Sequence, residues 1–443
     1  MTNENIDQQI ENAGLTRFHF GLLALGSFIY AFTAMNVLLI AAVLTPIIAE
    51  FGLAQQPLVS GLLLSAGFIG MFVGALTCGM LADRIGRKNT IIFTLLTMAV
   101  FTALNVFAPD VLTMAILRFL AGIGLGGALP QPGIYISEYV PAKYRGRFLG
   151  LTEAAWVYGA LLSLAFPFAL FPAIGWRLTF LVSLLPLILI PAVYFAPESL
   201  RYLQVSGKIQ EAISLLKKHK LVDADFKGDF VAVSSEKQGL KSTLAELWSA
   251  GFRKRTLMLW IAWAVLVYTY HGIFIWLPTF YYTSLGFTVV RSIQWVLIVT
   301  LAQVPGYYIA ALLLDKVGRK RIAIIFLASA GIGSAFLSLA LDTNSILLWS
   351  IVISFFNLGA WSALYAYTPE LYPTRIRGTA SGAAASIGRL VGAIAPTATP
   401  LLFAYGGLPA AFTAFALVHF IGAIAVAVLG LETKGKTLTE ISK

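Results

Sequence analysis

Residues 79–88 read GMLADRIGRK, and residues 311–320 read ALLLDKVGRK. In each segment an apolar stretch ends at an Asp, and a Gly-Arg-Lys turn begins three residues later. The two aspartates, Asp83 and Asp315, lie 232 positions apart in a chain of 443 residues. This spacing is about half of the chain, so it indicates that the two halves are related.

A second repeated motif has the same offset. Residues 137–146 read SEYVPAKYRG, residues 369–378 read PELYPTRIRG, and Glu138 and Glu370 are again 232 positions apart. Two different motifs rarely share one offset by chance, so we interpret the chain as a tandem duplication. Duplicated halves of this kind can rock against each other around a central site.

The composition indicates a membrane protein. Hydrophobic residues make up 58% of the chain and charged residues only 12%, and the mean hydropathy is +0.83, whereas soluble domains are about 25% charged. The apolar runs are about 20 residues long, enough to cross a bilayer. We therefore predict an all-α membrane protein with twelve transmembrane helices in two six-helix repeats, centred near Ala31, Ile69, Met98, Leu125, Ala160, Leu185, Ala264, Leu301, Ala330, Phe355, Ile387 and Phe420.

The positive charges predict the orientation of these spans. Only four of the 31 Lys and Arg residues fall within a span or on its far side, namely Arg118, Arg177, Arg291 and Arg389. The others lie at the termini or in alternate loops, so the positive-inside rule predicts a multi-pass protein of the cytoplasmic membrane with both termini in the cytoplasm. The net charge of +11 is then a topology signal, and we expect no nucleic-acid partner.

The charge pattern also divides the chain. We expect a cytoplasmic tail at residues 1–17 without a removable signal peptide, a six-helix half at 18–196, a cytoplasmic linker at 197–255, a second half at 256–431 and a tail at 432–443. Within the linker, IQEAISLL at residues 209–216 predicts a short amphipathic helix at the membrane surface.

The repeated motifs predict a gate at the cytoplasmic face. Gly79, together with the series Gly67, Gly70 and Gly74, would let the second helix approach a neighbour closely. The carboxylate of Asp83 could face the positive N-terminal end of the eleventh helix. The gating candidates are Asp83, Arg87, Glu138, Arg145, Asp315, Arg319, Glu370 and Arg377. The alternative is that these are solvated loop charges that only fix the topology.

These motifs resemble the signature of the major facilitator superfamily. PESLR at residues 197–201 and LETKG at residues 431–435 resemble its sugar-porter and organic-ion branches. Spans seven to eleven, with YHGIFIWLP at residues 270–278, are similar to the bacterial niacin transporters and more distantly to organic cation/anion carriers and synaptic vesicle glycoprotein 2. The resemblance implies a transporter, not an enzyme, for a small aromatic monocarboxylate such as nicotinate.

Arg389, in the middle of span eleven, is the strongest candidate for a substrate-binding residue. A charge inside the hydrocarbon layer is costly and is by default a functional hypothesis, and the planar guanidinium suits a carboxylate. The resemblance to organic anion carriers, which look to have arginine at the matching position, also implies an anionic substrate. The alternative is that Arg389 only pairs with Glu153 of span five, which could instead carry a proton or lie at the headgroups.

The other substrate candidates are polar or aromatic residues within spans. Trp156 could stack on a ring, and Asn357 and Trp361 share one helical face. For each of them the alternative is ordinary helix packing. The remaining candidates are Tyr270, His271, Gln303, Thr33 and Asn36.

The chain departs from the niacin and aromatic-acid transporters at two places. These relatives tend to have aspartates in span one, where this chain has Thr33 and Asn36, and look acidic in span four, where it has Ala128. Glu153 is the main acid left within a span, so proton symport, uniport and exchange all remain open.

Several patterns resemble enzyme chemistry without its context. GIGLGG at residues 122–127 matches a dinucleotide-binding pattern but sits inside a span, so close helix packing is the better interpretation. Cys78 is interpreted as a small packing residue. We expect no cofactor and no metal. We expect a monomer in membrane lipid, with a small organic acid as its partner and protons as a further candidate. A cation or sugar carrier and a non-transporting receptor remain alternatives.

Overall fold

The computed structural model describes residues 10, 14–219, 221–222 and 245–434, and this part of the chain is helical without strands. The first half consists of α2 (Arg17–Glu50), α3 (Pro57–Ile85), α4 (Arg87–Ala103), η1 (Leu104–Phe107), α5 (Val111–Ala128), α6 (Gln131–Ser137), α7 (Ala142–Thr179), η2 (Phe180–Leu189) and α8 (Ile190–Phe195). The second half consists of α12 (Arg253–Leu285), α13 (Val289–Leu301), α14 (Gln303–Val317), α15 (Arg319–Ser338), α16 (Thr343–Glu370) and α17 (Thr374–Leu429).

The predicted twelve spans are confirmed. Ten helical stretches within the described residues are long and apolar enough to cross a membrane, and two of them, Lys143–Phe195 and Ile376–Leu429, exceed 50 residues. Each of these two reverses direction at a glycine with positive φ, Gly175 (73°) and Gly407 (63°), a conformation that L side chains avoid. Each is therefore two spans joined by a tight turn.

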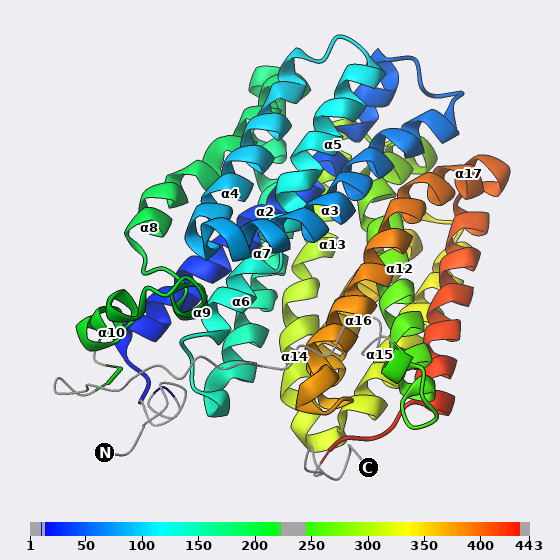
Figure 1. Ribbon diagram of the computed structural model, residues 1–443. Helices are drawn as coiled ribbons and strands as arrows, with labels where there is room; N and C mark the ends of the chain where they lie inside the picture. Colours follow the sequence, from blue (N-terminus) through cyan, green and yellow to red (C-terminus); the bar gives the residue numbers. More distant parts are fainter. Residues whose placement is uncertain (1–9, 11–13, 220, 223–244, 435–443) are drawn as a thin grey trace.

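The two halves lie beside each other, with the first half in blue to green and the second in yellow-green to red (Figure 1). Helix α2 begins and α17 ends at the same end of the molecule, where α9 (Leu200–Val205) and α10 (Ile209–Lys218) also lie (Figure 1). We call this end the terminal face and the other end the opposite face.

The predicted amphipathic helix of the linker is present as α10, but its apolar face does not lie on lipid. Ala212 and Leu216 are fully buried in the protein core. His219, which follows the helix, stacks on Phe18 at the start of α2 with ring centroids 4.1 Å apart. The apolar face of α10 therefore packs on the first half. Residues 223–244 of the predicted linker lie outside the described residues.

Glycines let α3 and α5 pack backbone to backbone, as the sequence predicts. A Cβ at Gly70 would lie 2.1 Å from the carbonyl oxygen of Phe119, and one at Gly126 would lie 1.9 Å from that of Met71. The GIGLGG run is thus a packing surface. The prediction for Gly79 is wrong, because a Cβ there would meet nothing within 4 Å.

Gly70 and Gly79 offer a matched test on one helix. We expect Gly70→Val to lower the unfolding midpoint of the purified protein by several degrees, because overpacking against a backbone carbonyl costs about 1–3 kcal/mol. Gly79→Val, in open space, should change the midpoint little. Equal midpoints for the two variants in a thermal-unfolding measurement would contradict the packing seen between α3 and α5.

The halves contact each other through the ends of their helices at the opposite face. Ser65 of α3 donates to the carbonyl oxygen of Ala393 in α17 at 2.5 Å, and its hydroxyl lies 2.7 Å from that of Thr397. A Cβ at Gly61 would lie 2.4 Å from the Cα of Thr397. Toward the terminal face, by contrast, a Cβ at Gly146 of α7 or Gly378 of α17 would meet nothing within 4 Å. The halves are therefore closed against each other at the opposite face.

Candidate functional site

Arg389 lies in α17 and Glu153 in α7, and both side chains are partly buried. Within the described part of the chain, neither side chain forms an ion pair with any residue, including each other. The structure therefore does not contain the Arg389–Glu153 ion pair that the alternative interpretation requires. Two opposite charges lie in the centre of the molecule without a salt bridge.

A pair of tyrosines interacts with both of these charges. The hydroxyls of Tyr30 in α2 and Tyr365 in α16 are 3.3 Å apart and join the two halves. Both tyrosines interact electrostatically with Glu153 and with Arg389. The pair therefore links the acid of one half to the base of the other.

A hydrogen-bonded chain crosses the same centre and contains three of the predicted residues. Trp156 of α7 donates its indole N–H to the hydroxyl of Tyr270 in α12 at 2.8 Å, and Tyr270 donates to Oε1 of Gln303 in α14 at 3.3 Å. Gln303 is the first residue of α14, and Pro305 lies in the first turn of this helix, where a backbone N–H has no partner within the helix. These two hydrogen bonds connect α7 to α12 and α14 of the other half.

Aromatic rings form a wall on the second half beside Arg389. The rings of Trp361, Tyr365 and Trp263 lie 5.4 Å apart from one another, centroid to centroid. The indole N–H of Trp263 donates to Thr368 at 3.1 Å. Gly388, the neighbour of Arg389 in the sequence, lies against Trp263, and Arg389 interacts electrostatically with Tyr365 of this wall.

His271 lies on the first-half side of the same centre. Its Nδ1 lies 3.0 Å from the carbonyl oxygen of Val267, so this nitrogen is the donor. Its ring meets Phe68 of α3 edge-on at 4.8 Å and Trp156 at 6.4 Å. The residue therefore bridges the halves through ring contacts.

The three other predicted residues are enclosed within their own halves. Asn357 is fully buried and donates from Nδ2 to Thr269 at 2.9 Å and toward His419 at 3.0 Å. Thr33 donates to the carbonyl oxygen of Ile29, and Asn36 donates to that of Phe32. These side chains contact other helices or their own, behind the central cluster.

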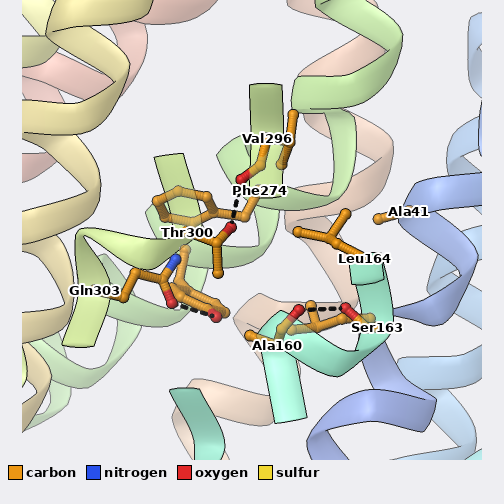
Figure 2. Close-up of a pocket in the computed structure, with 10 residues that line it drawn as sticks. Ala41, Ala160, Ser163, Leu164, Phe274, Val296, Thr300 and Gln303 are labelled. Carbon is orange, nitrogen blue, oxygen red and sulfur yellow. Dashed lines mark hydrogen bonds between the residues drawn. The ribbon is translucent and has the colours of Figure 1, made fainter. Parts of the chain in front are cut away.

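A small cavity adjoins the hydrogen-bonded chain. Figure 2 shows its walls, formed by α2, α7 and the second-half helices α12, α13 and α14. Its polar residues are Ser163, Tyr270, Thr300 and Gln303. Its volume of about 10 Å³ is about the room that one water molecule needs. In this closed arrangement it is too small for an aromatic acid.

Most of the gating candidates form one cluster per half at the terminal face. In the first half, Glu138 accepts a hydrogen bond from Ser199 and lies 3.6 Å from Nε of Arg87. Burial raises the pKa of Glu138, against the opposing effects of the Ser199 hydroxyl and the charge of Arg87. Glu198 accepts from the backbone N–H of Arg87 and Lys88 at 2.9 and 3.2 Å, as a carboxylate at a helix N-terminus does.

The second half repeats the main contacts of this cluster. Arg319 lies 3.1 Å from Glu370, and Glu370 accepts from Thr433 at 2.6 Å. Glu432 accepts from the backbone N–H of Arg319 at 3.0 Å. The duplication therefore extends from the motifs to their three-dimensional contacts.

The remaining gating candidates also contact their own halves. Asp83 is 73% exposed and pairs with Arg87 at 3.3 Å, and Asp315 is 85% exposed and pairs with Arg319 at 3.0 Å. The expected contact of Asp83 with the start of the eleventh helix is therefore not formed in this arrangement, in which the halves are closed at the opposite face. Two further arginines donate to carbonyls five residues earlier, Arg145 to Val140 and Arg377 to Tyr372.

Sequence reasoning missed several residues of the centre and the clusters. Tyr30 lies one turn before Thr33, and Tyr365 lies one turn after Trp361, so helical spacing from the chosen residues could have identified both. Tyr307 of α14, which donates to the carbonyl oxygen of Gly150 at 3.2 Å, follows Gln303 by the same spacing. Glu198 and Glu432 stand in the segments that carry the family resemblance.

Comparisons with known proteins agree with this architecture. The family model described as "Sugar (and other) transporter" matches residues 20–443. The niacin transporter NiaP of Acinetobacter baylyi is 39% identical over 98% of both chains, and the organic cation/carnitine transporter 7 of Arabidopsis thaliana is 27% identical over 99% of this chain and 96% of its own. The xylose transporter XylE of E. coli, in a partially occluded inward-open conformation, superimposes with a TM-score of 0.78 at 18% identity, covering 95% of this chain and all of that one.

Proposed function

Because the chain belongs to the sugar (and other) transporter family of the major facilitator superfamily, we propose that it carries nicotinate, or a closely similar aromatic monocarboxylate, across the cytoplasmic membrane by alternating access. The family and the fold make it a multi-pass membrane transporter and not an enzyme. The proposal concerns the substrate, the site and the orientation.

The observation that carries the proposal is the guanidinium of Arg389, which forms no ion pair among the described residues and interacts electrostatically with Tyr365 of the aromatic wall. A guanidinium can bind a carboxylate through two parallel hydrogen bonds, and aromatic side chains pack well against a heteroaromatic ring. The 39% identical relative named as a niacin transporter supports the choice of ring acid.

In this proposal Arg389 binds the carboxylate, and Trp156 and Trp361 bound the ring. Tyr270, Gln303 and His271 lie where the polar atoms of the ring can meet them once the halves part. The buried Asn357, Thr33 and Asn36 support the site from behind, and Glu153 completes its charge. These roles account for every predicted binding residue.

We propose that the terminal face is the cytoplasmic one, with both termini on that side, because the Lys and Arg residues concentrate there. The clusters around Glu138 and Glu370 would then form the cytoplasmic gate. Their residues are joined within each half in this arrangement and would meet across the halves when that face closes.

Radiolabelled uptake into vesicles tests the function. We expect saturable nicotinate uptake that benzoate competes for, and no competition by nicotinamide, which has the same ring and shape but no negative charge. Uptake inhibited by nicotinamide or by a sugar as strongly as by benzoate would contradict the role of Arg389 as a carboxylate receptor. Binding without counterflow would instead favour a receptor.

A further inference from the structure

The small cavity beside the hydrogen-bonded chain is lined by a buried donor that the proposed function leaves without a partner in this closed arrangement. Gln303 is fully buried, and its Nε2 has no hydrogen-bond acceptor within the described part of the chain. A buried amide N–H that makes no hydrogen bond is costly. The cavity that Gln303 lines offers the room for an acceptor.

The neighbours of Gln303 set the orientation of its amide group. Trp156 donates to the hydroxyl oxygen of Tyr270 at 2.8 Å, and the Tyr270 hydroxyl donates to Oε1 of Gln303 at 3.3 Å. If the amide were reversed, the tyrosine oxygen would face two donors and its own proton would lose its acceptor. Oε1 therefore faces Tyr270, and Figure 2 shows the nitrogen on the side of the amide away from that bond.

Two hydroxyl oxygens that line the same cavity are available as acceptors. Ser163 of α7 donates its proton to the carbonyl oxygen of Ala160 at 2.7 Å, and Thr300 of α13 donates to that of Val296 at 2.8 Å. Both protons are therefore used within their own helices, while each oxygen keeps lone pairs that can accept. Figure 2 shows both bonds, with Ser163 across the cavity from Thr300.

These three groups require a ligand that accepts one hydrogen bond and donates two. A water molecule does both, and buried waters in proteins typically make about three hydrogen bonds. The cavity volume of about 10 Å³ suits one water molecule. A metal cation would face the amide N–H, and an anion would face the two hydroxyl oxygens, so the donor set fits neither.

We propose that this cavity binds one ordered water molecule, which bridges the two halves and stabilises the closed opposite face. The water accepts from Nε2 of Gln303 and donates to the hydroxyl oxygens of Ser163 and Thr300. In the described part of the chain, no direct hydrogen bond joins Ser163 of the first half to Thr300 or Gln303 of the second. The water therefore supplies a polar contact that the side chains do not make themselves.

The bridge lies on the opposite-face side of the direct bond between Trp156 and Tyr270. Along α7, Ser163 is about two turns beyond Trp156, toward the reversal at Gly175. When the halves part at this face, the cavity opens and bulk water reaches the same three groups. The bridge therefore favours the closed arrangement without leaving a polar group unpaired in the open one.

An experimental density map of the purified full chain, with its opposite face closed, tests the site itself. We expect one isolated peak within about 2.7–3.2 Å of Nε2 of Gln303 and of the hydroxyl oxygens of Ser163 and Thr300. A cavity without density, in a map that resolves other buried waters, would overturn the proposal.

Labelling of single cysteines introduced at the opposite face measures what the bridge contributes to closure. Ser163→Ala and Thr300→Val each remove one acceptor of the water, so labelling should rise about two- to tenfold, the net effect of one hydrogen bond. Ser338→Ala is the matched control and should label like the wild type. Ser338 donates to the carbonyl oxygen of Ala335 at 2.7 Å in α15 and does not line the cavity. Thermal unfolding checks that each variant is folded.

The double variant distinguishes one shared water from two independent hydroxyl groups. If a single water bonds to both, the first substitution already breaks the bridge. Ser163→Ala combined with Thr300→Val should then raise labelling by clearly less than the product of the two single effects. Equal labelling of Ser163→Ala and Ser338→Ala, or single effects that multiply fully, would overturn the inference. Neither measurement uses nicotinate, so the outcome does not depend on the proposed substrate.

Discussion

Replacing Arg389 by Lys is expected to weaken nicotinate binding by about two orders of magnitude and to bring transport to background. A lysine keeps the positive charge but presents a point charge in place of a planar fork, so the two parallel hydrogen bonds to a carboxylate are lost. Removing one partner of a buried, charged hydrogen-bonded pair typically costs about 2–5 kcal/mol. Arg389→Gln, which also removes the charge, should be at least as severe. Both effects are read from a binding isotherm and from vesicle uptake.

Arg291→Gln is the control for loss of a cation from the second half. Arg291 lies over the ring of Phe287 at a distance of 4.4 Å, away from the central tyrosines, so nicotinate binding should be unchanged. The site assignment would be abandoned if Arg389→Gln bound nicotinate as the wild type does. A fall in binding of the same size for both arginines would point instead to a general effect of net charge.

Gly61→Trp is expected to abolish transport by preventing closure of the opposite face. Even a Cβ at Gly61 would lie 2.4 Å from the Cα of Thr397, and backbone atoms cannot move aside as a flexible side chain can. The variant should therefore favour the arrangement in which α3 and α17 part at the opposite face. Because the fold of each half is untouched, nicotinate should still bind from that side.

Accessibility of single cysteines introduced at the opposite face measures this shift. Labelling should rise several-fold in Gly61→Trp, while transport falls to background. Gly21→Trp is the matched control, since Gly21 lies on the exposed surface of α2 with nothing within 4 Å of a Cβ, and it should label and transport like the wild type. Unchanged labelling together with full transport in Gly61→Trp would contradict the contact between the halves.

Two of the predicted binding residues show why sequence spacing is insufficient for a site. Asn357 and Trp361 are four residues apart on one helical face, yet Asn357 turns to Thr269 and His419, whereas Trp361 faces Tyr365 and Trp263. Spacing places residues on a common stripe of the helix surface. Which part of the stripe meets a neighbouring helix and which part meets the centre depends on how the helix is rotated in the bundle.

Glu153 and Arg389 show the same limit for charges. Both were recognisable as intramembrane charges, because a charge within an apolar run is visible in a single sequence. Their shared interaction with Tyr30 and Tyr365 was not visible, because these four residues come from four helices spread over the whole chain.

The twelve spans, the duplication and the close packing of the glycine-rich helices α3 and α5 followed from the chain alone, because hydropathy, motif offset and small-residue spacing are properties of short segments. That these two helices pack on each other was shown only by the structure. The partners of the central charges, the face at which the halves meet, and the ion pairs that Asp83 and Asp315 make within their own halves were decided only in three dimensions. Those features depend on contacts between segments hundreds of residues apart, where a small rotation or tilt of one helix exchanges one partner for another.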